Sequence, residues 1–294
     1  MHNIKVFYHK GTVDGKTSAH ILKLLLPNAD YIPIDFNNSF QIAKVDTKKA
    51  DVYVLGFPMQ KALWSSLDNS KTVTYISSQS DTTPEFLSNT DVDILNTNGE
   101  STFVGLWYHL FPGKPLPLIY QHINKYLKTP HTSKGTEDVL GYYLCNILSF
   151  RPTLGGFSEK LAELSTSVEA MHLSSIYAEG NAHSQTIKSL ASHILEASAD
   201  AESVYIIFGV KTLIVNIPKI FNVFIKEYLM EEYDNLLTYC DVGDNRYWAF
   251  HSKEIDTLEV ARMFNGFGNS SSSGFTTKQE ITYSILNKEW ENPC

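Results

Sequence analysis

The sequence predicts an α/β protein made of two domains joined by a helical connector. Short apolar strands alternate with helix-like segments through the first part of the chain, which is typical of a mostly parallel sheet with helices on both faces. Helical patterns then dominate the middle, and strands return later. We therefore expect a parallel-sheet domain over residues 1–130, a helical connector over 131–180 and a smaller α/β domain over 181–294.

Composition and charge exclude several classes of protein. The 294 residues are 43% hydrophobic and 19% charged, as in an ordinary globular chain, and the formal net charge is −8. Lys and Arg are scattered along the sequence, so we do not expect duplex nucleic acid as a partner. The most apolar stretch, 203–225, is interrupted by Lys211, Asn216, Pro218 and Lys219, and we do not expect it to span a membrane.

The cysteines and the N-terminal residues indicate the cellular compartment in which the protein is expected. Cys145, Cys240 and Cys294 have no metal-binding spacing, and their odd number argues against a disulfide framework. The N-terminal residues do not resemble a signal peptide. We therefore expect a soluble, intracellular protein in a reducing compartment.

In the first domain, apolar runs alternate with segments of helical period, such as the one in which Ile21, Leu22, Leu25 and Leu26 share a face. The predicted strands are 4–9, 31–36, 52–57, 73–76 and 92–95. The predicted helices are 17–26, 59–67, a short one around 84–87, 101–111 and 116–127. Because ligands bind beyond the carboxyl ends of parallel strands, chemistry is expected at residues 9–14, 56–58, 77–81 and 96–101.

The connector and second domain follow from the same kinds of pattern. Helices are predicted over 136–149, 157–177 and 182–197, with Gly180 between the last two. Predicted strands are 204–208, 213–217, 236–240 and 247–250, and predicted helices are 218–231 and 255–263. The last helix has Asp256 as its N-cap, with Glu259 three residues on.

A glycine- and serine-rich stretch, FNGFGNSSSSGF at 264–275, follows that helix. Gly266, Gly268 and Gly274 would let its backbone approach a ligand closely, and such loops can present several N–H groups to an anion. Considered alone, the stretch is better explained as a surface turn. We predict a loop here.

Two distant stretches resemble one family. Residues 8–19, YHKGTVDGKTSA, resemble the first motif of the DHH phosphoesterases, near the nanoRNase, oligoribonuclease-like and exopolyphosphatase-like members. Residues 250–275 resemble the DHH-associated C-terminal domain, with its strand, Asp-initiated helix and glycine-rich loop. The resemblance implies hydrolysis of phosphodiester or phosphoanhydride bonds by two divalent metals, usually manganese, ~3.5–4 Å apart.

This chain departs from the family at most of the metal positions. His9 and Asp14 remain in the first motif. Gly56 stands where relatives carry an aspartate, and Ser77, Ser78 and Gln79 replace Asp-His-His. The segment 123–128, where a fourth aspartate is expected, contains no acid. Asp81 is either a substitute ligand or a loop or helix-capping acid.

The substrate side is altered as well. His251-Ser252 replaces Arg-Ser, which removes a permanent, bidentate phosphate donor. Asn269 replaces a histidine, whereas Gly266 and Gly268 are retained. These five residues are the candidate phosphate-binding set, with weakened affinity expected.

Structural explanations compete with the functional ones. His9 could simply be hydrogen-bonded to its neighbours, Asp14 could be the N-cap of the helix predicted at 17–26, and His251 could be a half-buried structural residue. We predict a catalytically inactive DHH-like protein that has no catalytic or metal-binding residues and needs no cofactor. His9 and Asp14 would then be vestigial metal positions.

Its role would be that of a binding or structural subunit, with a protein partner or a second copy of the chain. Weak nucleotide or phosphate binding in the cleft between the domains is a second hypothesis. The third is an active phosphodiesterase on short oligonucleotides or cyclic dinucleotides, with Mn²⁺ at an atypical site of His9, Asp14 and Asp81.

Overall fold

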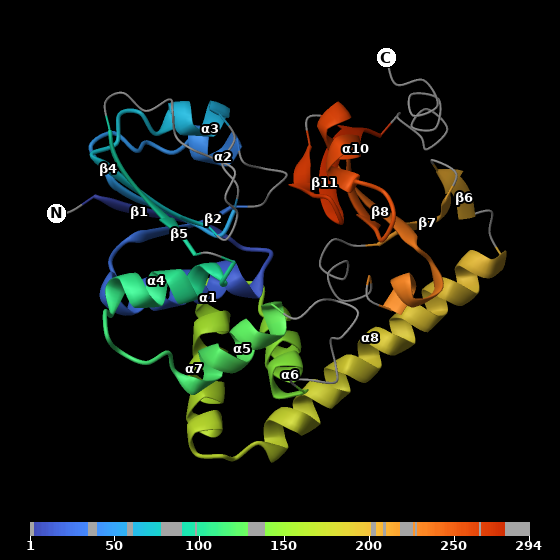
Figure 1. Cartoon of the computed structure of the whole chain (residues 1–294), viewed down its shortest axis with the longest axis horizontal. Helices are drawn as coiled ribbons and strands as arrows, with labels where there is room; N and C mark the ends of the chain where they lie inside the picture. The colour runs from blue at the N-terminus through green and yellow to red at the C-terminus, as the bar shows by residue number, and fades with distance from the viewer. Residues whose placement is uncertain are drawn as a thin grey trace. The chain divides into compact units, whose positions relative to one another are not determined.

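A computed structural model describes most of the chain, in two compact units, Met1–His183 and Ser184–Cys294 (Figure 1). The described residues are 3–34, 40–57, 61–77, 90–97, 99–128, 139–200, 204–207, 210–217, 226, 228–264 and 266–279. The predicted domain boundaries at residues 130 and 180 stay predictions.

The first unit is built on a parallel sheet, as predicted. Its strands are β1 (Ile4–His9), β2 (Asp30–Ile34), β3 (Asp51–Leu55), β4 (Thr72–Ser77) and β5 (Asp91–Asn96). They lie in the order β2-β1-β3-β4-β5, and each neighbouring pair is parallel. The prediction of an α/β protein with a parallel-sheet first part is confirmed.

Helices cover both faces of this sheet (Figure 1). α1 (Val13–Leu25) and α4 (Thr102–Leu110) lie on one face, and beyond them come α5 (Leu118–Lys128), α6 (Val139–Ser149) and α7 (Leu154–Glu169). The other face carries α2 (Phe40–Ala43), which the sequence did not predict, and α3 (Lys61–Ser66). Side chains of β1 alternate accordingly, with Val6 and Tyr8 in the larger core and Phe7 in the smaller one.

The connection between the long helices differs from the prediction. α7 ends at Glu169 and α8 runs from Ser174 to Asp200, so Gly180 lies within a helix rather than between two. The break falls near Met171, which has a φ of 57°. Gly180 is required by packing, since a Cβ there would lie 2.4 Å from Cβ of Tyr143. Here glycine marks a close helix contact and not a helix end.

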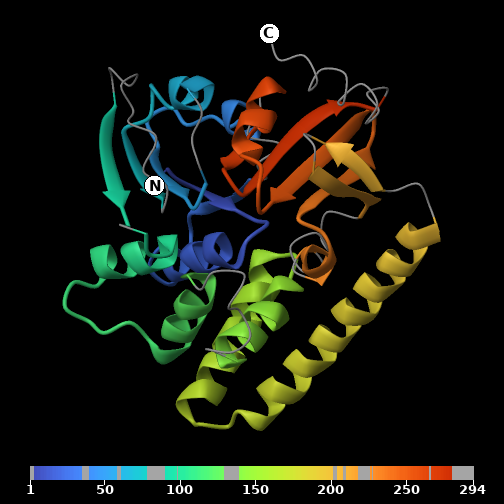
Figure 2. The same ribbon diagram turned by 45° about the vertical axis from the view of Figure 1, so that its right-hand side comes forward.

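The second unit is built on a mixed sheet (Figure 2). Its elements are β6 (Val204–Ile207), β7 (Val210–Asn216), β8 (Asn235–Val242), β9 (Asn245–Ser252), α10 (Thr257–Met263), β10 (Phe267–Asn269) and β11 (Ser272–Lys278). The strand order is β10-β11-β9-β8-β7-β6, and β7 and β8 pair in parallel. α10 packs against β9, β10 and β11 over a core that includes Trp248, Phe250, Val260 and Phe275.

The glycine- and serine-rich stretch is a β-hairpin and not the predicted loop. β10 and β11 pair in antiparallel fashion, with Phe267 opposite Gly274 and Asn269 opposite Ser272. The hairpin forms because β11 also pairs along β9, so the backbone N–H and C=O groups of the stretch find partners in the sheet.

Four predicted helices fall partly or wholly outside the described residues, and two of them, 59–67 and 136–149, lose only their first residues. The short one around 84–87 lies wholly outside, and of the one at 218–231 the structure describes 226 and 228–231, with helix continuing to 232. None of the helices in the described ranges is long and apolar enough to cross a membrane.

Candidate functional site

The strand order places a topological switch point between β1 and β3. From β1 the chain passes through α1 to β2 on one side, and it later enters β3 on the other side of β1. In open α/β sheets, ligands bind outside the carboxyl ends of the strands at such a point. The residues that follow β1, β3 and β4, with the starts of α1 and α4, are therefore the candidate site.

Asp14 lies in the first turn of α1, and its carboxylate reaches the start of α4. Oδ2 accepts the backbone N–H of Thr102 and Oδ1 accepts that of Phe103, each at 3.1 Å. Thr102 and Phe103 are fully buried, and Ser101, the N-cap of α4, makes no side-chain capping hydrogen bond. Asp14 thus satisfies two of the N–H groups that a helix start leaves without partners.

The predicted role of Asp14 as the N-cap of its own helix is wrong. α1 begins at Val13, and its N-cap is Thr12, whose hydroxyl accepts the N–H of Gly15 at 3.1 Å. The helix therefore starts four residues before the predicted position. Asp14 is already inside it, where its side chain caps a neighbouring helix instead.

A third N–H group at the start of α4 is satisfied from α5. Asn124 Oδ1 accepts the N–H of Ser101 at 3.2 Å, and Asn124 Nδ2 donates to Glu100 Oε2 at 2.7 Å. Lys128 pairs with the same carboxylate, and its hydrogen bond and that of Asn124 lower the pKa of Glu100. Glu100 lies in the predicted segment 96–101, but the sequence analysis assigned no role to Glu100 or Asn124, because their partners lie far away in the sequence.

His9 ends β1 and is buried. Its Nδ1 lies 3.3 Å from Thr12 Oγ1. The start of α1 packs closely on its backbone, since a Cβ at Gly15 would lie 2.3 Å from the His9 carbonyl oxygen. His9 is therefore part of the junction between β1 and α1.

Gly56 follows β3 and has a φ of +74°. A Cβ at this position would lie 3.4 Å from Thr102 Oγ1 and 3.5 Å from Gly15 Cα. The end of β3 is thus in contact with the starts of both α1 and α4. Because Gly15 and Gly56 have no side chains, these three segments approach one another closely.

At the end of β4, Ser77 is buried, and its carbonyl accepts the N–H of Thr97 at 3.3 Å. The next candidates, Ser78, Gln79 and Asp81, lie outside the described residues. No structural role is assigned to those three.

α1 also carries two buried titratable side chains on another face. Lys16 Nζ donates to the carbonyl oxygen of Arg151 at 2.9 Å and lies 5.1 Å from the ring centroid of Phe157. Burial lowers the pKa of Lys16 to about 8. Burial, and then the charge of Lys23, lowers the pKa of His20 to about 4.

The shift at His20 predicts a pH dependence of stability. Its pKa is about 4 in the folded chain against the ordinary value of 6.5, so the unfolded chain binds more protons between these values. Stability should therefore fall as the pH drops from 6.5 towards 4, and His20→Leu should make this slope shallower by up to about 1.4 kcal/mol per pH unit. Urea denaturation at several pH values measures the slope of the unfolding free energy against pH.

The control is His109→Gln, which replaces an exposed histidine of α4. Equal slopes in wild type and His20→Leu would contradict the prediction.

In the second unit, Ser252 is engaged by its neighbours. Its hydroxyl donates to Asn235 Oδ1 at 2.5 Å and accepts the N–H groups of Glu254 and Ile255 at 3.0 and 2.6 Å. His251 is buried, and its Nδ1 lies 2.9 Å from Ser272 Oγ. These contacts hold the end of β9, the turn before α10 and the start of β11 together.

Gly266 and Gly268 lie in crowded backbone positions at the hairpin. A Cβ at Gly266 would lie 2.4 Å from the Gly274 carbonyl oxygen, and one at Gly268, with φ +152°, would lie 2.4 Å from that of Ser272. Gly266 N–H also donates to Ala261 O at 2.7 Å, which closes the end of α10. Asn269 is the last residue of β10. The candidate phosphate-binding set stays a prediction, but packing alone explains both glycines.

Comparison with known proteins gives a likeness of fold. No family model and no curated protein matches the sequence. Over 98% of this chain, the structure is similar to that of RecJ from Thermus thermophilus in complex with Mn²⁺, with a TM-score of 0.54 and 14% identity, and it spans 52% of RecJ. The fold is similar to that of about half of RecJ.

Two further solved structures cover nearly the whole chain at lower similarity. A pGpG-specific phosphodiesterase, PggH from Vibrio cholerae, has a TM-score of 0.45 and 13% identity over 98% of each chain. An exopolyphosphatase-related protein from Bacteroides fragilis has a TM-score of 0.46 and 10% identity, over 99% of this chain and 93% of its own.

The metal pair implied by resemblance to the DHH family does not fit those residues at the switch point that the structure describes. Both oxygens of Asp14 accept backbone N–H groups, and Gly56 offers no side chain. Ser77 is a neutral hydroxyl, which cannot balance the charge of two dications. In the described parts of the chain, no group of three or more His, Cys, Asp or Glu side chains is placed to hold a metal ion.

Proposed function

We propose that this DHH-like protein does not hydrolyse phosphoesters with a metal pair and serves as a binding or structural subunit. The observation that carries the proposal is the role of Asp14. His9 and Asp14 are the two residues of the first motif that match metal positions of the family, and Asp14 is the one with a carboxylate. Its two carboxylate oxygens cap the start of α4. A carboxylate that accepts two backbone N–H groups has less capacity left for dications.

The packing around Asp14 supports the same proposal. Gly56 replaces the expected aspartate and lies against Gly15 and Thr102. An aspartate at this position would have to place its carboxylate beside Asp14, among buried segments. Like charges held close together without a metal are unfavourable. The substitution to glycine is therefore consistent with a junction that is now structural.

The binding role rests on what remains of the fold. The first unit has a parallel sheet, and the second unit has a strand, a helix and glycines in the order that the resemblance to the family motif implies. The proposed binding partner is another protein or a second copy of this chain, and the alternative is a nucleotide. Size-exclusion chromatography with light scattering tests self-association directly.

The decisive experiment is a hydrolysis assay with metal analysis. We expect no Mn²⁺- or Mg²⁺-dependent turnover of short oligonucleotides, cyclic dinucleotides or polyphosphate above background. We also expect no bound transition metal after purification and no rise of the melting temperature with added Mn²⁺. Turnover that Asp14→Asn abolishes, at a temperature where circular dichroism shows this variant folded, would contradict the proposal and favour an active metal-dependent phosphodiesterase.

Nucleotide binding is tested by thermal shift with mono- and dinucleotides. A ligand at 100 times its dissociation constant should stabilise the folded chain by about 2.7 kcal/mol. A shift that His251→Ala removes would place a nucleotide at the candidate set in the second unit. No shift with any of these ligands would leave a protein partner as the proposed role.

A further inference from the structure

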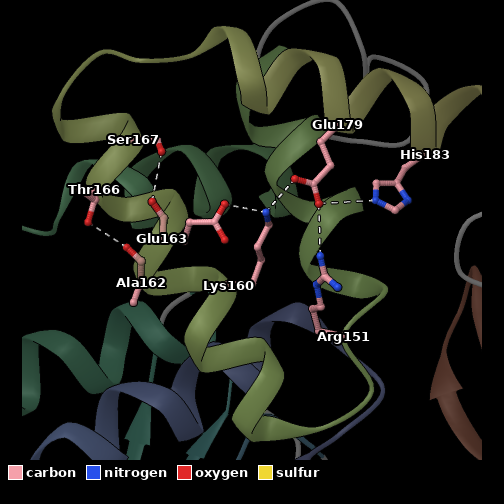
Figure 3. A network of polar contacts seen from close by, with 8 residues as sticks. All are labelled: Arg151, Lys160, Ala162, Glu163, Thr166, Ser167, Glu179 and His183. Atoms are coloured by element: carbon pink, nitrogen blue, oxygen red, sulfur yellow. Dashed lines mark hydrogen bonds and ion pairs between the residues drawn. The ribbon is translucent and has the colours of Figure 1, made fainter.

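A cluster of charged side chains centred on Glu179 fastens the first turns of α8. Glu179 Oε2 accepts a hydrogen bond from Lys160 Nζ of α7 at 2.7 Å (Figure 3). Glu179 Oε1 accepts one from Arg151 Nη2, just after α6, at 3.2 Å. His183, one turn further along α8, lies 3.8 Å from the same oxygen. One carboxylate therefore joins three segments of the first unit.

The cluster is partly shielded from water. The Lys160 side chain is 12% exposed, against 32% for Glu179. Burial alone would lower the pKa of Lys160, but its hydrogen bonds with Glu179 and Glu163 raise it above its ordinary value. The two carboxylates therefore favour the charged form of Lys160 at this partly shielded site.

Aromatic contacts surround the charged cluster on the α6 side. The rings of Tyr143 and Tyr177 meet edge to face at 5.7 Å, and those of Phe150 and His183 stack at 4.6 Å. Gly180 lies directly against Tyr143. On α8, the residues that make these contacts all lie within 174–183. The boundary between the two compact units comes immediately after this segment, between His183 and Ser184.

The same cluster is connected to α1 through Arg151. The side chain of Arg151 holds Glu179, while its backbone carbonyl accepts the hydrogen bond from Lys16. α8 continues without interruption from Ser174 to Asp200, across the boundary between the units. The fastened turns are thus the last part of the first unit before the chain enters the second.

We propose that the Glu179 cluster is a salt-sensitive latch that keeps residues 174–183 of α8 docked on α6 and α7. Opening the latch frees these turns to fray or to move with the rest of α8, while the sheet of the first unit stays folded. The docking of these turns is adjustable by ionic strength, because the charges of the latch are only partly shielded.

Hydrogen–deuterium exchange of the full chain, read by mass spectrometry, tests the latch. Glu179→Gln should speed exchange of the amides of residues 174–183 by about tenfold and leave the strands of the first sheet unchanged. The matched control is Glu163→Gln, which removes the other carboxylate that bonds Lys160 but is 64% exposed and lies on α7. This control should leave the exchange of residues 174–183 nearly unchanged.

A salt titration of the wild-type chain gives a second readout without any substitution. Raising NaCl from about 0.05 M to about 1 M should speed exchange of the same segment in wild type and have little effect in Glu179→Gln. Unchanged exchange in Glu179→Gln would overturn the proposal. So would a uniform rise across the whole first unit, since this would mean that the cluster contributes only to global stability.

Discussion

Replacing Asp14 with alanine should destabilise the first unit by about 3 kcal/mol. The change removes both acceptors at the start of α4 and leaves the N–H groups of Thr102 and Phe103 buried without partners. Hydrogen bonds to charged groups are worth about 1.5–3 kcal/mol each, and burial of unpaired donors adds to the loss. Urea denaturation followed by far-ultraviolet circular dichroism measures the effect, with the m-value checked for a change.

Two variants make the result specific to the capping role. Asp14→Asn keeps one acceptor oxygen and should lose about half as much stability. Asp30→Ala removes an exposed aspartate that pairs with Lys5 on the surface, and should change stability by less than about 1 kcal/mol. If Asp14→Ala were as mild as Asp30→Ala, the cap on α4 would not be important for stability.

The pKa of Asp14 fixes the direction of any pH effect. Burial raises this pKa above the ordinary value, although the N–H groups of Phe103 and Thr102 act against the rise. A raised pKa in the folded chain adds stability below the unfolded pKa, and this addition is lost as the pH rises through the folded value. Protonation of Asp14 therefore does not contribute to unfolding in acid, whereas protonation of His20 does.

Replacing Gly15 with alanine should destabilise the chain by at least about 3 kcal/mol. The added methyl group would lie 2.3 Å from the carbonyl oxygen of His9 and 2.8 Å from its Cβ. Neither atom belongs to the flexible end of a side chain, so β1 and α1 would have to separate. Thermal and urea denaturation should both show the loss.

Gly155 is the matched control for this substitution. It also lies in the first turn of a helix, α7, but a Cβ there would meet no atom within 4 Å. Gly155→Ala should be neutral or stabilise by about 0.5–1 kcal/mol, because alanine loses less conformational entropy in a helix. Similar effects at the two glycines would show that helix propensity, and not the contact with His9, determines the outcome.

These two predictions concern the Asp-Gly pair that carries the resemblance to the first family motif. Both residues have a structural role in this chain, since Asp14 caps α4 and Gly15 allows α1 to approach β1. Their presence in the sequence therefore does not require a metal. This is the physical basis of the proposed loss of two-metal chemistry.

Local patterns were sufficient for most strands and for the class of the fold. The apolar runs at β1, β3 and β4 are short and lie between polar segments, and all three form within one or two residues of the prediction. The strands of the second unit around Gly243 also form as predicted. Such runs predict strands because strands buried on both faces need continuous apolar side chains.

Glycine was the main source of error. Gly180 was predicted to separate two helices, but it lies inside α8 against Tyr143. Gly266 and Gly268 were predicted to shape a loop, but they allow a crowded hairpin to form. A sequence shows that a glycine is present, and not whether it supplies a turn or merely the absence of a side chain.

By itself, the sequence determined that the chain is an α/β protein with a parallel first sheet, and that it lacks acids at most of the positions where its resemblance to the DHH family implies metal ligands. Only the tertiary structure decided what the surviving residues do. Asp14 and Thr102 are separated by 88 positions, and Asn124 and Ser101 by 23. Such capping contacts leave no local pattern, because they depend on which helix starts are brought together at the end of a sheet.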